Sequence, residues 1–264
     1  MNVEDDRVGN GSQSELLDAA LGAGSDIEQL AVKFLSSLRL TQDDDVGLLM
    51  CSMFVRCLSF FRAVRYLSRQ HLSQPAAACV RSLIEQRWVL ESVACESTRA
   101  ESRCWLEQHN EHNRKRSLNS LRAMGQDERD HRITDERLNE LEADLDSASS
   151  KTDLVKWAEL ANRKNEYLTA YALLCNMTHP SLAAVEEHLF FNADGRVQSV
   201  TAKAGGPSLS LHVIHACEVM IDVIAACSGA WRMEEVSDHA NDLRHRLGEL
   251  WEQVPDQLSH SEQA

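Results

Sequence analysis

The sequence predicts an all-α protein: a multi-helix bundle of long helices with one projecting charged helical arm and a small β-hairpin. Apolar residues recur with a 3.6-residue period along nearly the whole chain, which is typical of amphipathic helices. Between Gly47 and Gly195 the only glycine is Gly125, so long helices run without the residue that weakens them. All four prolines stand where an apolar run starts or stops, at positions 75, 180, 207 and 255.

The N-terminal half is expected to hold four helices. Residues 1–14 are acidic and rich in Gly, Asn and Ser, so we expect a disordered arm before a helix over 14–21. Ser25 and Glu28 have the spacing of a capping box, which predicts that the next helix begins at residue 25 and runs to 40. Helices over 44–71 and 75–97 follow, the latter starting with a proline suited to the first turn.

The middle of the chain, residues 98–164, is densely charged and is expected to be a helical insertion that projects from the bundle. Its helices, over 98–124 and 128–149, carry only a narrow apolar stripe that includes Leu138 and Leu141. The charged faces are either simply solvated, or a surface for a protein partner, or a local RNA contact. The residues of such an RNA contact would be Arg114, Lys115, Arg116 and Arg122.

The C-terminal part completes one bundle domain over 15–253. Helices are expected over 152–179, 181–188, 207–231 and 234–253, followed by a flexible tail over 254–264. Between them, residues 189–202 read as a β-hairpin around the turn Asp194-Gly195.

Composition excludes several classes of protein. The formal charge of −14 offers no global attraction to nucleic acid or to an anionic membrane. The start of the chain lacks the cationic and apolar regions of a secretory signal, so we expect a cytoplasmic protein. The most apolar stretch, 209–227, is interrupted by charged and imidazole side chains that a bilayer would penalise, so we expect no membrane span. Eight cysteines without a C-x-x-C pattern are expected to be reduced core residues.

The helix over 75–97 is apolar almost all round and interrupted by two polar pairs. Arg81 precedes Glu85, and Arg87 precedes Glu91, by the four residues that let side chains meet on a helix. Stranding one partner of a buried pair costs about 3–5 kcal/mol, so either pair is as consistent with a structural role as with an active site.

A second group of polar residues lies on the helix before Pro180. Tyr171, Cys175, Thr178 and His179 share one stripe, and the proline places His179 at the helix end. There its imidazole is suited to act as acid, base or anion contact, or only to cap the last carbonyls.

A third stripe contains His212, His215 and Asp222. A di-iron centre would need Glu-x-x-His on two helices, and the chain has this motif only at Glu128–His131, in a wholly polar stretch. We therefore expect a solvated or interhelical polar face, no metal and no cofactor. The phosphate-loop, dinucleotide-binding and nucleophile-elbow motifs are missing as well.

These residues resemble an uncharacterised bacterial family of all-helical proteins. The runs that carry the resemblance are FFRAVRYL at 60–67, ACVRSLIEQRW at 78–88 and the Tyr171 helix ending in His179, and it covers roughly 48–189. Asn176 stands where the family more usually has serine.

That family is distantly similar to the HEPN superfamily of helical bundles, many of which are RNases in toxin–antitoxin and phage-defence systems. The resemblance implies Arg81, Glu85, Tyr171 and His179 as site residues. HEPN nucleases usually carry Arg-x4–6-His within one helix, and this chain lacks that motif in the expected place.

We expect a cytoplasmic homodimer of bacterial defence or stress response that uses this polar group to bind a protein partner, an antitoxin or a small anion. The alternative is a metal-independent endoribonuclease in which His179 transfers protons, Arg81 stabilises phosphate charge and Tyr171 orients either; RNA is a partner only in this case. A bundle oxygenase would need carboxylates and histidines converging from at least three helices.

Overall fold

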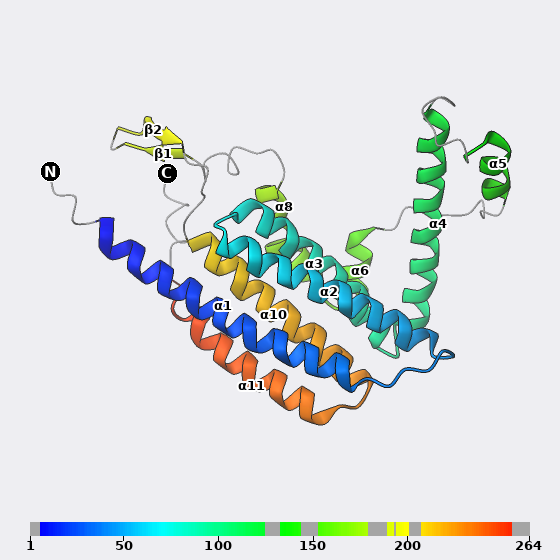
Figure 1. Cartoon of the computed structure of the whole chain (residues 1–264), viewed down its shortest axis with the longest axis horizontal. Coiled ribbons are helices and arrows are strands. Elements are labelled where there is room, and N and C mark those ends of the chain that lie inside the picture. The colour runs from blue at the N-terminus through cyan, green and yellow to red at the C-terminus, as the bar shows by residue number, and fades with distance from the viewer. Residues whose placement is uncertain are drawn as a thin grey trace.

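The computed structural model describes residues 6–124, 133–143, 153–178, 189–192, 194–200 and 207–254, and it confirms the all-α multi-helix fold. Five long helices lie side by side in the bundle (Figure 1). They are α1 (Asp6–Ser37), α2 (Asp45–Arg69), α3 (Ser73–Ala94), α10 (Pro207–Ala230) and α11 (Glu234–Trp251).

Helix α10 is the central element of the bundle. It packs against α1, α2, α3 and α11, and most of its apolar side chains from Val213 to Cys227 are fully buried. By length and hydropathy alone, stretches of α2 and α10 would be able to cross a membrane. In α10, 67% of that stretch is buried inside the protein, and in α2 39%. The burial of the α10 stretch is that of a core helix, whereas more than half of the α2 stretch is not buried.

Helix α1 corrects the prediction for the first forty residues. It is one continuous helix from Asp6, so part of the expected disordered arm is helical, and the expected helix start at Ser25 is wrong. Glu28 does not cap a helix; it pairs with Arg62 and Arg65 of α2. Packing of the apolar face of α1 outweighs the local start signal, since most helical stability in proteins comes from tertiary contacts.

The charged arm projects from the bundle as predicted (Figure 1). Helix α4 (Arg99–Ala123) buries only Ser102 and Leu118 among its described side chains. The short helix α5 (Asp135–Ala143) lies beside it and buries Leu138. Of the helix expected over 128–149, only 133–143 falls within the described residues.

The helix expected over 152–179 is broken, which corrects the prediction. The structure has α6 (Leu154–Leu160), α7 (Lys164–Glu166), the π-helix η2 (Tyr167–Tyr171) and α8 (Ala172–Thr178). The break occurs at Asn162, whose φ of 57° is left-handed, a conformation that asparagine tolerates better than most residues. The helix expected over 181–188 lies outside the described residues.

The predicted hairpin is present. Strands β1 (Leu189–Phe191) and β2 (Val197–Val200) pair antiparallel, with Leu189 opposite Val200. Gly195 has a φ of 73°, which the turn requires and glycine adopts without strain.

The cysteines are all free, and only some of them lie in the core. Cys57, Cys217 and Cys227 are buried, and burial raises the pKa of Cys57 and of Cys217 to about 12. Cys95 and Cys104 are exposed, because they lie at the start of the projecting arm and not in the bundle.

Candidate functional site

Helix α3 carries the candidate site on its partly exposed side. Arg81 Nε lies 3.7 Å from Glu85 Oε1, and the two side chains are 27% and 25% exposed. The Tyr171 hydroxyl donates to Glu85 Oε1 at 2.6 Å, and Arg81 Nη1 donates to Thr178 Oγ1 at 3.0 Å. We call these four residues the Arg81 cluster. Three of the four predicted site residues therefore meet, while His179 lies outside the described residues.

The π-helix η2 positions Tyr171 within the cluster. Its ring stacks on Tyr167 with a centroid distance of 5.4 Å and packs against Trp88 of α3 at 5.1 Å. Single π turns inside helices are often found at functional sites. Burial and the neighbouring Glu85 carboxylate raise the pKa of Tyr171, so the phenol stays protonated and acts as a donor and not as a base.

Arg81 keeps part of its hydrogen-bonding capacity. Its Nη1 donates to Thr178, but its Nε has no hydrogen-bond partner among the described residues. The Glu85 oxygen nearest to it is already taken by the tyrosine, and a separation of 3.7 Å is too long for a hydrogen bond. The guanidinium therefore has one buried donor that lacks a partner among the described residues, on a side chain that is 27% exposed.

The second predicted pair, Arg87 and Glu91, belongs to a larger group that the sequence did not indicate. Arg87 is 2% exposed, and its two Nη atoms donate to Asp222 at 2.9 Å and to Glu166. Its Nε lies 3.9 Å from Glu91. Burial lowers the pKa of Arg87, and the carboxylates around it oppose that shift. We call the group the charge network, and it consists of Arg87, Glu91, Arg163, Glu166, Asp222 and Arg244.

Two further arginines complete the charge network. Arg163, at the break after α6, donates to Glu91 at 2.8 Å and to Asp222 at 3.0 Å. Arg244 of α11 donates to Asp222 at 2.7 Å. The network therefore ties α3, α7, α10 and α11 together, which assigns it a structural role.

The third predicted stripe faces neighbouring helices. His212 Nε2 lies 3.3 Å from Ser73 Oγ, and Asp222 serves the charge network. His215 lies 3.7 Å from Glu166, and burial lowers its pKa. Within the described part of the chain, no group of three or more His, Cys, Asp or Glu side chains is arranged to hold a metal ion. The geometry is that of an interhelical polar face.

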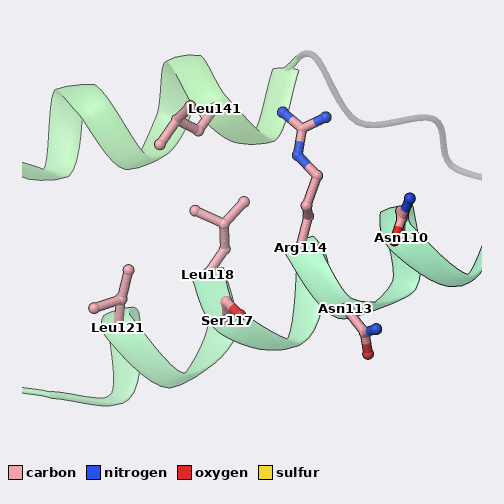
Figure 2. Close-up of a pocket in the computed structure, with 7 residues that line it drawn as sticks. All are labelled: Asn110, Asn113, Arg114, Ser117, Leu118, Leu121 and Leu141. Carbon is pink, nitrogen blue, oxygen red and sulfur yellow. The ribbon is translucent and has the colours of Figure 1, made fainter. Parts of the chain in front are cut away.

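Several hollows border the arm, and two of them bear on the predicted residues. Figure 2 shows the open groove between α4 and α5, about 660 Å³, where Arg114 and Leu118 point towards Leu141. Arg122, one of the residues predicted to contact RNA, pairs instead with Glu142 at 2.6 Å. The second hollow, about 600 Å³, is lined by α2, α3, α4 and α6 and includes Glu85. We call it the α3–α4 cleft; sequence reasoning missed it because its walls come from distant segments.

Fold and site together define a helical-bundle protein in which the partly exposed Arg81 and Glu85 and the buried Tyr171 lie beside a cleft. Residues 47–196, more than half of the chain, match the family of unknown function DUF5677, and the chain belongs to this family. No curated protein and no solved structure matches it. The matched region contains the whole Arg81 cluster and every residue that lines the α3–α4 cleft.

Proposed function

We propose that this protein is a cytoplasmic, homodimeric component of bacterial defence or stress response, and that its Arg81 cluster binds a small oxyanion or an acidic group of a protein partner. The defence context rests on the distant similarity of the family in the sequence analysis to the HEPN superfamily, which implies Arg81, Glu85, Tyr171 and His179 as site residues. The binding chemistry rests on the geometry of Arg81.

The single observation that carries the proposal is a buried donor without a partner on a partly exposed arginine. Arg81 Nε has no hydrogen-bond partner among the described residues, although the side chain is only 27% exposed. Burying such a donor without a partner costs about 1–3 kcal/mol, which a bound oxyanion would recover. Guanidinium groups are also the preferred partners of phosphate and carboxylate.

The neighbours of Arg81 support the same chemistry. Tyr171 engages Glu85 Oε1 through a hydrogen bond of 2.6 Å, and this oxygen lies 3.7 Å from Arg81 Nε, so it makes no hydrogen bond to the arginine there. Thr178 holds the guanidinium from the opposite side and fixes its orientation. A preoriented donor loses less conformational entropy on binding.

The experiment is a thermal unfolding series with inorganic phosphate, comparing wild type with Arg81→Gln. The matched control is Arg69→Gln, which removes an exposed arginine from the last turn of α2. Phosphate should raise the melting temperature of wild type and of the control, and should lose this effect in Arg81→Gln. An equal rise in all three proteins would refute the site.

The second candidate function, a metal-independent endoribonuclease, is favoured by one contact. Arg81 donates to Thr178, the residue that precedes His179 in the sequence. In this function His179 is the acid or base, and Arg81 stabilises charge on the phosphate. Tyr171 would act by positioning Glu85, since its proton is donated there.

Cleavage of total cellular RNA in EDTA tests this candidate. Wild type should cleave, and Arg81→Ala and His179→Ala should both be inactive although circular dichroism shows that they fold. Intact RNA with the wild-type protein would exclude the nuclease and leave the anion-binding proposal, which the phosphate series tests separately. Light scattering of the purified protein checks the proposed dimer.

A further inference from the structure

The α3–α4 cleft has the size and composition of a small-molecule site. Its volume of about 600 Å³ lies within the range of ligand pockets in proteins. Its walls come from four helices, α2, α3, α4 and α6. Figure 1 shows that α4 is the helix that projects from the bundle. The site goes beyond the proposed function, since it is separate from the Arg81 guanidinium and shares only Glu85 with that cluster.

The inner wall of the cleft is apolar. Met53, Val89 and Trp157 line it and are only 9%, 9% and 5% exposed, so they belong to the core of the bundle. Such a wall favours the face of an apolar or aromatic group, because contact there removes the remaining apolar surface from water.

The rim of the cleft is rich in amides. Gln86 comes from α3, and Asn110 and Asn113 come from two turns of α4. Each amide offers both donors and an acceptor, so together they suit a ligand whose edge alternates donors and acceptors. A ligand that presents only acceptors, such as a phosphate chain, would leave half of this capacity unused.

The charges of the cleft nearly cancel. The lining contains Arg56, whose guanidinium lies 5.9 Å above the Phe60 ring, and Glu85. The imidazole of His109 also lines it, and burial together with His112 lowers the pKa of His109, which favours its neutral form. A ligand with several negative charges would find one cation here, so an uncharged ligand fits better.

Glu85 supplies the specific feature. Its Oε1 accepts from Tyr171 and faces Arg81, while no hydrogen bond to Oε2 occurs among the described residues. An ionised carboxylate oxygen acts only as a hydrogen-bond acceptor, so its ligand must supply a donor. Guanine carries N–H donors at its 1 and 2 positions, next to the acceptor O6. Adenine lacks this combination.

We propose that the α3–α4 cleft binds an uncharged guanine nucleoside. The base lies against Met53, Val89 and Trp157, Glu85 accepts from the guanine N–H edge, and the amides of Gln86 and Asn113 bond to its acceptors and donors.

Isothermal titration calorimetry with guanosine tests the proposal, with adenosine and cytidine as comparison ligands. Wild type should bind guanosine at least tenfold more tightly than either comparison. Asn113→Ala and Gln86→Ala should each weaken guanosine binding about tenfold, since each removes one hydrogen-bonding group. The matched control is Asn119→Ala, an exposed amide on α4 that does not line the cleft, and its affinity should equal that of wild type.

Three results would overturn the assignment: no heat of binding with guanosine, equal affinity for all three nucleosides, or equal loss in Asn113→Ala and Asn119→Ala. None of these results depends on Arg81, so they are distinguishable from failure of the phosphate series. Circular dichroism of each variant confirms that lost binding is not lost folding.

Discussion

Replacing Arg87 by methionine should destabilise the protein by about 3–5 kcal/mol, because it strands the carboxylates of the charge network. Arg87 is 2% exposed and donates to Asp222 and Glu166, whose side chains are 19% and 18% exposed. Each hydrogen bond to a charged group contributes about 1.5–3 kcal/mol. Methionine keeps much of the volume, so the loss reports on charge and not on a cavity.

The remaining arginines limit the loss. Arg163 and Arg244 still neutralise Asp222, but they are 37% and 45% exposed and their pairing is weakened by solvent. For a chain of this size, the expected loss corresponds to a fall in melting temperature of about 10 °C.

The assay is urea unfolding followed by far-UV circular dichroism. The matched control is Arg246→Met, which breaks a 2.9 Å pair with Asp26 whose side chains are 59% and 42% exposed. We expect the control to lose less than about 1 kcal/mol. If Arg87→Met is no less stable than Arg246→Met, the charge network does not hold the helices together and the reasoning fails.

Three further outcomes are expected. Gly22→Ala should stabilise α1 by about 0.5–1 kcal/mol, because alanine favours a helix and nothing lies near the new Cβ. Gly24→Ala should destabilise the protein, because its Cβ would lie 3.0 Å from the Arg65 side chain, which pairs with Glu28. Differential scanning calorimetry compares the two variants. Tyr171→Phe should lower the free energy of unfolding in urea by about 1–2 kcal/mol, because the Tyr171 hydroxyl donates to Glu85. Tyr167→Phe, the control, should lower it hardly at all, and equal losses in the two variants would contradict this prediction. Burial lowers the pKa of His215 below its ordinary 6.5. As the pH falls through 6.5, the unfolded chain therefore takes up a proton at this histidine before the folded protein does. The neutral His215 thus contributes to the stability of the fold above this pH, and that contribution is lost as the pH falls. Stability measured from pH 7.5 down to about 5.5 should therefore fall less in His215→Gln than in wild type.

Local signals predicted the elements whose cause is local. The hairpin follows from Asp194-Gly195, because its turn needs a residue that adopts a positive φ. The start of α2 also has a local cause, which the sequence analysis did not use: the Asp44 side chain accepts from the Gly47 amide at 2.8 Å. The Arg81–Glu85 pair follows from helical spacing alone.

Elements decided by tertiary contacts were not predictable in this way. Ser25 and Glu28 have the pattern of a helix start, yet Glu28 is used by two arginines of α2 and the helix continues through. The break at Asn162 has no strong sequence signal, because many asparagines lie inside helices. The break brings Arg163 close to Glu91, and this contact can be seen only in the folded structure.

The same limit applies to the candidate site. Spacing predicted which residues share a face of α3, but not that Thr178 would bond to Arg81 or that Asp222 would bond to three arginines. The α3–α4 cleft was missed because His109 and the amides of α4 read as a solvated face. Their role depends on where the arm leaves the bundle.

The π turn at Tyr167–Tyr171 sets the rotational phase of everything that follows it in the same run of helix. It takes in one residue more than an α-helical turn would, and each residue of an α-helix turns the chain by about 100°. If the same residues formed a regular α-helix, α8 would be turned by roughly that angle and Thr178 would be carried away from Arg81. Deleting Ala170 would instead remove the extra residue and leave α8 in its present phase. The contact between α3 and α8 therefore depends on a π turn that absorbs a single extra residue, and a chain shortened by that residue keeps the Arg81 cluster.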